Sequence, residues 1–108
     1  MPTPSEHTRL QLELYLNIHA RAAWPQLAGL RVRHRGQYAY VEGELAGGER
    51  RKLMRLRYNG TASRWGFALY DAASDRYQDS LLPTGSGSGS PEDALDIACH
   101  LHLAAPDS

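Results

Sequence analysis

Arginine and tyrosine side chains recur at alternate positions through the middle of the chain. The set that can do chemistry together is Arg31, Arg33, Arg35, Tyr38, Tyr40, Arg55, Arg57 and Tyr70. Because side chains alternate between the two faces of a strand, residues two apart point the same way. Guanidinium groups bind carboxylates and phosphates, and tyrosine rings pack at protein interfaces or stack on bases. The pattern predicts a binding surface on one face of a sheet, with no catalytic group.

Three interpretations of this surface differ in what it contacts. The leading one is a non-enzymatic binding module whose Arg/Tyr face meets an acidic protein partner or a second copy of the chain. The alternative is a domain that binds single-stranded nucleic acid, with Arg50, Arg51 and Lys52 extending a phosphate track. The third is a small enzyme with a pocket near His34, Trp65 and the Gly/Ser segment.

The same pattern also fits an ordinary solvated face of an antiparallel sheet. Glu42 and Glu44 are expected opposite Arg55 and Arg57 across a Gly47-Gly48 hairpin, where they would form ion pairs. Tyrosine is also common in strands for reasons of packing alone. The residues therefore predict a charged face and leave open whether it has a ligand.

The formal net charge of zero hides a division along the sequence. Residues 1–64 hold eleven of the twelve basic side chains and five of the twelve acids, a formal charge of +6. Residues 65–108 hold one base, Arg76, and seven acids, a formal charge of −6. This asymmetry can indicate a charged partner and makes head-to-tail self-association electrostatically possible.

Two helices are predicted, one near each end of the chain. The first is expected to be capped by Thr3 and to end near Ala23, before Pro25, with an apolar stripe at Leu10, Leu14 and Ile18. The second is expected to be capped by Ser90 and to fade by Pro106, with a stripe at Ala94, Ile97 and Leu101.

The second helix begins with acidic residues. The α-β-β-β-α order resembles the topology of double-stranded RNA-binding domains, which have a basic cluster at the start of the last helix. Here Glu92 and Asp93 occupy that position and would repel phosphate, which argues against membership.

Between Leu30 and Leu82 the apolar period changes to two, which predicts antiparallel strands. Turns are expected at Gly47-Gly48, Asn59-Gly60 and residues 72–75. Whether Arg35-Gly36 is a turn or a bulge decides between five strands and four. The apolar face expected against the helices consists of Val32, Ala39, Val41, Leu45, Met54, Leu56, Trp65, Phe67 and Leu69.

The fold class that follows is α+β in two layers, an antiparallel meander of four or five strands with both helices on one face. The chain is expected to form one domain over residues 1–108, with a flexible Gly/Ser loop at 83–90. No apolar run reaches the ~20 residues of a membrane helix, and the first residues lack a signal-peptide pattern, so we expect a cytoplasmic protein without a membrane partner.

Metal and acid-base chemistry are weakly indicated. On a helix Cys99 and His102 share a face, which offers two ligands where a structural zinc site needs four. His34 falls on the apolar face and is expected to be a hydrogen-bonded core residue. We therefore predict no metal, no cofactor and no catalytic residue.

Four segments carry a resemblance to known proteins. They are residues 24–27 (WPQL), 55–58 (RLRY), 65–70 (WGFALY) and 91–96 (PEDALD). They resemble segments of small uncharacterised single-domain proteins of GC-rich bacteria, over residues 24–104. The resemblance implies a bacterial protein and no particular activity.

Overall fold

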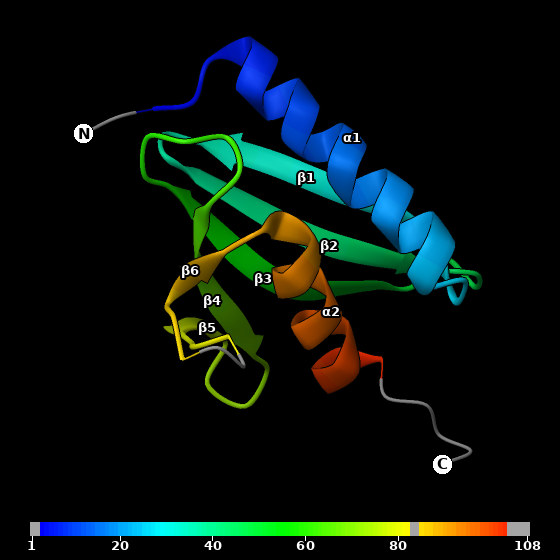
Figure 1. The fold of residues 1–108 in the computed structure, drawn as a ribbon. Coiled ribbons are helices and arrows are strands. Elements are labelled where there is room, and N and C mark those ends of the chain that lie inside the picture. Colours follow the sequence, from blue (N-terminus) through cyan, green and yellow to red (C-terminus); the bar gives the residue numbers. More distant parts are fainter. Residues whose placement is uncertain (1–2, 83–84, 104–108) are drawn as a thin grey trace.

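The structure is a computed structural model and describes residues 3–82 and 85–103. In chain order its elements are α1 (Glu6–Ala23), β1 (Leu27–Arg35), β2 (Tyr38–Leu45), β3 (Arg50–Tyr58), β4 (Trp65–Asp71), β5 (Arg76–Asp79), β6 (Ser88–Gly89) and α2 (Pro91–His102) (Figure 1). Strands β1 to β5 form an antiparallel meander in sequence order, and β6 pairs with β4. The predicted α+β class is confirmed.

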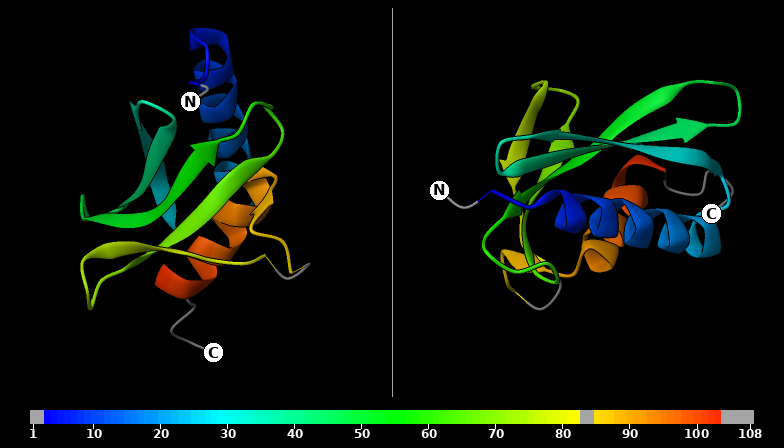
Figure 2. Two further views of the ribbon diagram at one scale, coloured as in Figure 1. Left: turned by 90° about the vertical axis from the view of Figure 1, so that its left-hand side faces the viewer. Right: turned by 90° about the horizontal axis from the view of Figure 1, so that it is seen from above.

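Both helices lie on the same side of the sheet, as Figure 2 shows from two directions. α1 packs on β1 and on α2, and α2 packs on β3 and β4. The core between the layers contains the whole apolar face expected from the sequence. In the part of the chain that the structure describes, no layer covers the opposite face of the sheet, where the alternating Arg and Tyr side chains lie.

Glycines in turns determine the strand number. Gly36 has φ +60 and, with Gln37, forms the two-residue connection between β1 and β2. This φ is one that glycine adopts readily, and it allows a tight hairpin turn. Because the chain turns here, residues 27–45 form two strands, and the meander has five strands in all. The turn predicted at Gly47-Gly48 is present, with Gly48 at φ +90, and residues 72–75 connect β4 to β5. Gly60 has φ +106 but lies in a six-residue connection, residues 59–64, so the tight turn expected at Asn59-Gly60 is wrong.

A bulge in β3 shifts the alternation of its side chains. Val41 pairs with Met54, but the next residue of β2, Glu42, pairs with Lys52. Leu53 is therefore an extra residue, and both Leu53 and Met54 are fully buried. The bulge places Lys52 on the same face as Arg55. With strict alternation, Lys52 would lie on the opposite face.

The rotation of α1 differs from the prediction. The buried residues of the helix are Leu12, Leu16 and Ala20, whereas the expected stripe of Leu10, Leu14 and Ile18 faces solvent. Both sets repeat every four residues, so periodicity alone does not distinguish them. The contacts of His34 with Glu13 and of Asp96 with His19 fix the rotation instead.

The helix caps and the Gly/Ser segment show two further differences. α1 is capped by Ser5, whose extended backbone lets its hydroxyl accept from the Thr8 N–H at 3.1 Å, so the cap expected at Thr3 is wrong. The cap of α2 is Ser90, as predicted. Within the expected loop 83–90, residues 88–89 form β6 against Trp65 and Gly66, while residues 83–84 lie outside the described residues.

Candidate binding face

The face of the sheet turned away from the helices is called the open face. Its side chains are Arg31, Arg33, Arg35, Tyr38, Tyr40, Glu42, Glu44, Arg50, Lys52, Arg55, Arg57, Tyr70, Tyr77 and Asp79. All eight residues singled out from the sequence lie on it, because the strand register keeps their alternation in phase.

Two rows of Arg, Tyr and Arg run across the first three strands. Tyr40 lies between Arg33 on β1 and Arg55 on β3. In the next row, Tyr38 lies between Arg35 and Arg57. Neighbouring strands lie ≈ 4.8 Å apart, so each of these tyrosines has an arginine at the paired position of both adjoining strands.

A cluster of four tyrosine rings occupies the middle of the open face. The ring centroids of Tyr40 on β2 and Tyr77 on β5 are 5.4 Å apart, although strands β3 and β4 lie between β2 and β5. Tyr70 lies 5.3 Å from Tyr77, and Tyr38 lies 6.3 Å from Tyr40. The tyrosines are all half-buried, so their rings pack mainly on one another.

Tyr77 was missed in the sequence analysis. The segment of residues 76–82 was expected to form a short strand, but its faces were not assigned. The signal was available, because Tyr77 and Asp79 share a face, and the β4–β5 turn pairs Tyr77 with Tyr70.

Cations lie over the rings of this cluster. The guanidinium carbon of Arg55 is 4.7 Å from the Tyr38 centroid and 5.8 Å from that of Tyr77. Arg33 lies 5.5 Å from the Tyr40 centroid, and the Lys52 ammonium lies 5.3 Å from that of Tyr70. These are cation–π distances, and the cations thus occupy ring surface that a ligand would otherwise use.

The two ends of the open face differ in charge balance. Near the β2–β3 turn, Arg50 pairs with Glu44 at 3.8 Å, and Lys52 pairs with Asp75 at 3.8 Å. At the β1–β2 turn, Arg33, Arg35 and Arg57 have no carboxylate within ion-pair distance among the described residues. The unneutralised positive charge is therefore concentrated at the second end.

The expected pairing of Glu42 and Glu44 with Arg55 and Arg57 is wrong. In the register, Glu42 is opposite Lys52 and Glu44 is opposite Arg50, because the β2–β3 turn spans four residues and β3 contains the bulge. Arg55 instead lies near Asp79, with 3.7 Å between its Nη2 and Oδ1. The charge of Arg57 is therefore not neutralised by the glutamate that the sequence predicted beside it.

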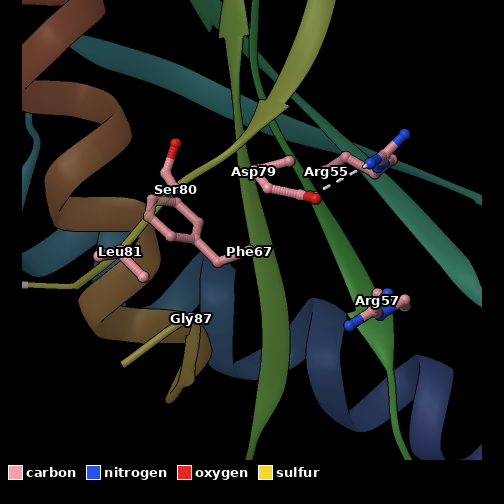
Figure 3. Close-up of a pocket in the computed structure, with 8 residues that line it drawn as sticks. Arg55, Arg57, Phe67, Asp79, Ser80, Leu81 and Gly87 are labelled. Carbon is pink, nitrogen blue, oxygen red and sulfur yellow. Dashed lines mark ion pairs between the residues drawn. The ribbon is translucent and has the colours of Figure 1, made fainter. Parts of the chain in front are cut away.

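A hollow of about 230 Å³ opens beside the two arginines of β3 (Figure 3). Its lining residues are Arg55, Arg57, Phe67, Ala68, Asp79, Ser80, Leu81 and Gly87. Gly66 on β4 leaves space for the Arg57 side chain, because a Cβ at position 66 would lie 3.2 Å from Arg57 Nε. The absent side chain lets Arg57 extend across β4 toward the hollow.

Tyrosine ionisation on this face is suppressed. The Tyr70 hydroxyl donates a hydrogen bond to Asp75, and this bond, with a smaller contribution from burial, raises the pKa of Tyr70 to about 12. Burial, and then the charge of Glu42, raises the pKa of Tyr77. Both hydroxyls remain neutral near pH 7, so the net charge of the face is set by its arginines, Lys52 and its carboxylates.

Other residues considered from the sequence have structural contacts. His34 Nε2 lies 2.8 Å from Glu13 Oε2, in keeping with the predicted hydrogen-bonded histidine. Trp65 is buried and donates its indole N–H to the Ala62 carbonyl. The Arg51 guanidinium, proposed as part of a phosphate track, donates to the His102 carbonyl.

Cys99 and His102 do not form part of a metal cluster in the described residues. Cys99 is fully buried, and this burial raises the pKa of its thiol to about 12. His102 Nε2 lies 2.9 Å from the Tyr70 carbonyl oxygen. Within residues 3–82 and 85–103, no group of three or more metal-binding side chains is close enough to hold an ion.

Comparisons of the chain with protein-family models, with curated proteins and with solved structures gave no match. Neither helix in the described part of the chain is long and apolar enough to cross a bilayer.

Proposed function

We propose that this protein is a non-enzymatic binding module whose open face binds an acidic segment of a protein partner. The observation that carries the proposal is the position of Arg33 and Arg55 over the rings of Tyr40, Tyr38 and Tyr77. The rings beneath these two arginines hold their guanidinium groups in place on the open face. Arg and Tyr are among the residues that are enriched at protein interfaces.

The uneven charge of the face supports an anionic partner. Arg31, Arg33, Arg35 and Arg57 have no ion-pair partner in the part of the chain that the structure describes. Three of them surround the β1–β2 turn and the end of β3. Planar guanidinium groups bind carboxylates in two-point contacts, which gives orientation as well as attraction.

The covered faces of the tyrosine rings favour a protein as the partner of the open face over single-stranded nucleic acid. Base stacking needs an exposed ring face. Tyr38, Tyr40 and Tyr77 are half-buried against one another and lie under guanidinium groups. Phosphates would be attracted by the same arginines, but without the stacking that makes such platforms bind bases.

A separate partner is favoured over head-to-tail binding of a second copy. Several carboxylates of the acidic half have partners within the chain: Asp75 pairs with Lys52, Asp79 with Arg55, and Asp96 with His19. Asp71 accepts hydrogen bonds within the β4–β5 region. These four carboxylates are therefore less available to the open face of a second copy than the charge division along the sequence suggests.

Amide NMR of the labelled protein tests the proposal. The probes are a peptide of alternating Glu and Leu and a mixed single-stranded DNA oligomer, each added at about 50 and 200 mM salt, over which phosphate contacts weaken strongly. We expect peptide-induced shifts in β1, β2 and β3 that shrink with salt. Larger shifts with DNA, including the tyrosine ring resonances, would favour the nucleic-acid alternative. No shift with either probe would contradict a charged binding face.

A further inference from the structure

The outer side of α1 carries an apolar stripe with no covering element among the described residues. Leu10, Leu14 and Ile18 are 59%, 55% and 58% exposed. They repeat every four residues, so they fall within an arc of about 80° on the helix. Leu12 and Leu16, which hold the helix to the sheet, lie two residues out of phase and point the other way.

This stripe differs from scattered exposure. Single apolar side chains on a surface are normal, whereas a contiguous row marks a contact site. Leu81 and Leu101 are also exposed, at 66% and 57%, but Leu81 lies in the segment after β5 and Leu101 on α2, so neither belongs to this row. The stripe also lies on the opposite side of the molecule from the open face, because α1 covers the other side of the sheet (Figure 2).

We propose that a second copy of this chain covers the stripe, by antiparallel pairing of the two α1 helices about a twofold axis through Leu14. In this register Leu14 meets Leu14 of the second copy, and Leu10 meets its Ile18. Side chains at the centre of such a contact are therefore all apolar, as in an isologous interface.

Charges at the two ends of the helix match this register. Glu6 lies eight residues before Leu14 and Arg21 lies seven after it, and both are exposed. With a rise of about 1.5 Å per residue, Glu6 of one copy comes within about 1.5 Å in height of Arg21 of the other. About the helix axis, Glu6 lies about 80° and Arg21 about 20° from Leu14 in the same direction, so the twofold axis brings them to one side of the contact and generates two Glu–Arg pairs.

A parallel arrangement lacks this complementarity, because it brings Glu6 beside Glu6 and Arg21 beside Arg21. A membrane surface is also a poorer occupant. Helices that lie on anionic membranes have polar faces rich in Lys and Arg, whereas α1 has two arginines and two glutamates. The contact is one helix wide, smaller than the ~800 Å² per partner of a standard interface, so we expect a weak dimer.

Cysteine crosslinking tests the register directly. With Leu14→Cys, mild oxidation is expected to give a disulfide-linked dimer, because the two positions meet at the axis. With Leu10→Cys, the two cysteines lie about 12 Å apart along the helix pair, and crosslinking is expected to be at least tenfold slower. Native Cys99 is buried, so the protein without an added cysteine is the control and is expected to form no disulfide-linked dimer.

Sedimentation of the unmodified chain over a range of concentrations gives the second readout. Leu14→Lys is expected to shift the monomer–dimer midpoint at least tenfold upward, whereas Leu101→Lys, an equally exposed leucine on α2, leaves it unchanged. Arg21→Glu should weaken the dimer, and adding Glu6→Arg should restore it. Equal crosslinking at positions 10 and 14, or a monomer at millimolar concentration, would overturn the proposal.

Discussion

Arg55 lies over the ring of Tyr38, with 4.7 Å between its guanidinium carbon and the ring centroid. The same guanidinium lies 5.8 Å from the Tyr77 centroid, and its Nη2 is 3.7 Å from Asp79 Oδ1. One side chain of β3 thus links the aromatic cluster to β2 and to β5. This arrangement makes the open face a prearranged surface.

Arg55→Met tests the contribution of these contacts. Methionine keeps the apolar stem but removes the cation, and we expect unfolding in urea to require about 1 kcal/mol less free energy. Arg57→Met is the matched control, since Arg57 has no ring beneath it in the described residues, and its change should stay below about 0.5 kcal/mol. Equal losses would show that the cation–π contacts do not stabilise the face.

Leu16→Ala and Leu14→Ala compare the two apolar stripes of α1. Leu16 is fully buried, so its truncation leaves a cavity and should cost about 2–5 kcal/mol. Leu14 is 55% exposed and should cost less than about 1 kcal/mol in dilute solution. Urea unfolding followed by tryptophan fluorescence measures both. A larger loss at Leu14 would mean that α1 is rotated from the position described.

Asp96→Ala tests the polar link between the helices. Asp96 Oδ1 lies 2.8 Å from His19 Nε2 and accepts the Trp24 indole N–H at 2.9 Å. Removing the acceptor leaves the indole N–H without a partner, and we expect a loss of about 1–3 kcal/mol in unfolding free energy. Asp96→Asn keeps an acceptor oxygen and should lose less. Similar losses for the two variants would contradict a hydrogen-bonding role.

The titration of Tyr70 tests the described contact with Asp75. The pKa of Tyr70 is raised from 10.0 to about 12, first by its hydrogen bond to Asp75. Because the folded-state pKa is raised, the associated stability is present below pH 10 and is lost as the pH rises toward 12. Asp75→Asn should move the pKa back toward 10. Ultraviolet titration of tyrosinate, with Tyr70→Phe to assign the signal, measures it, and an unchanged pKa would contradict the contact.

The sheet and its two faces were largely predictable from the sequence. Strict alternation placed Val41 inside and Tyr40 outside, and Gly47-Gly48 marked a turn. These features are local, with a period of two that needs no knowledge of neighbouring elements. The eight predicted Arg and Tyr residues accordingly lie on one face.

Features that depend on distant partners were missed. The Leu53 bulge changes the partner of Glu42 to Lys52, and nothing in the local pattern of β3 shows it. The rotation of α1 depends on His19 meeting Asp96, 77 residues away. The charge division along the sequence gives separate basic and acidic surfaces only if the two halves do not pair with each other. Asp79 of the acidic half lies near Arg55 of the basic half, so the two charges are partly neutralised in the fold.

The most direct test of the binding face is the affinity of a fluorescent Glu/Leu peptide for three single variants. Arg33→Gln and Arg57→Gln each remove a charge from the open face, and each should weaken binding about 2–5-fold and flatten its salt dependence. Arg76→Gln removes the same charge from β5, outside that face, and should bind like the unmodified protein. Equal weakening by all three variants, or no measurable binding by the unmodified protein, would contradict the account.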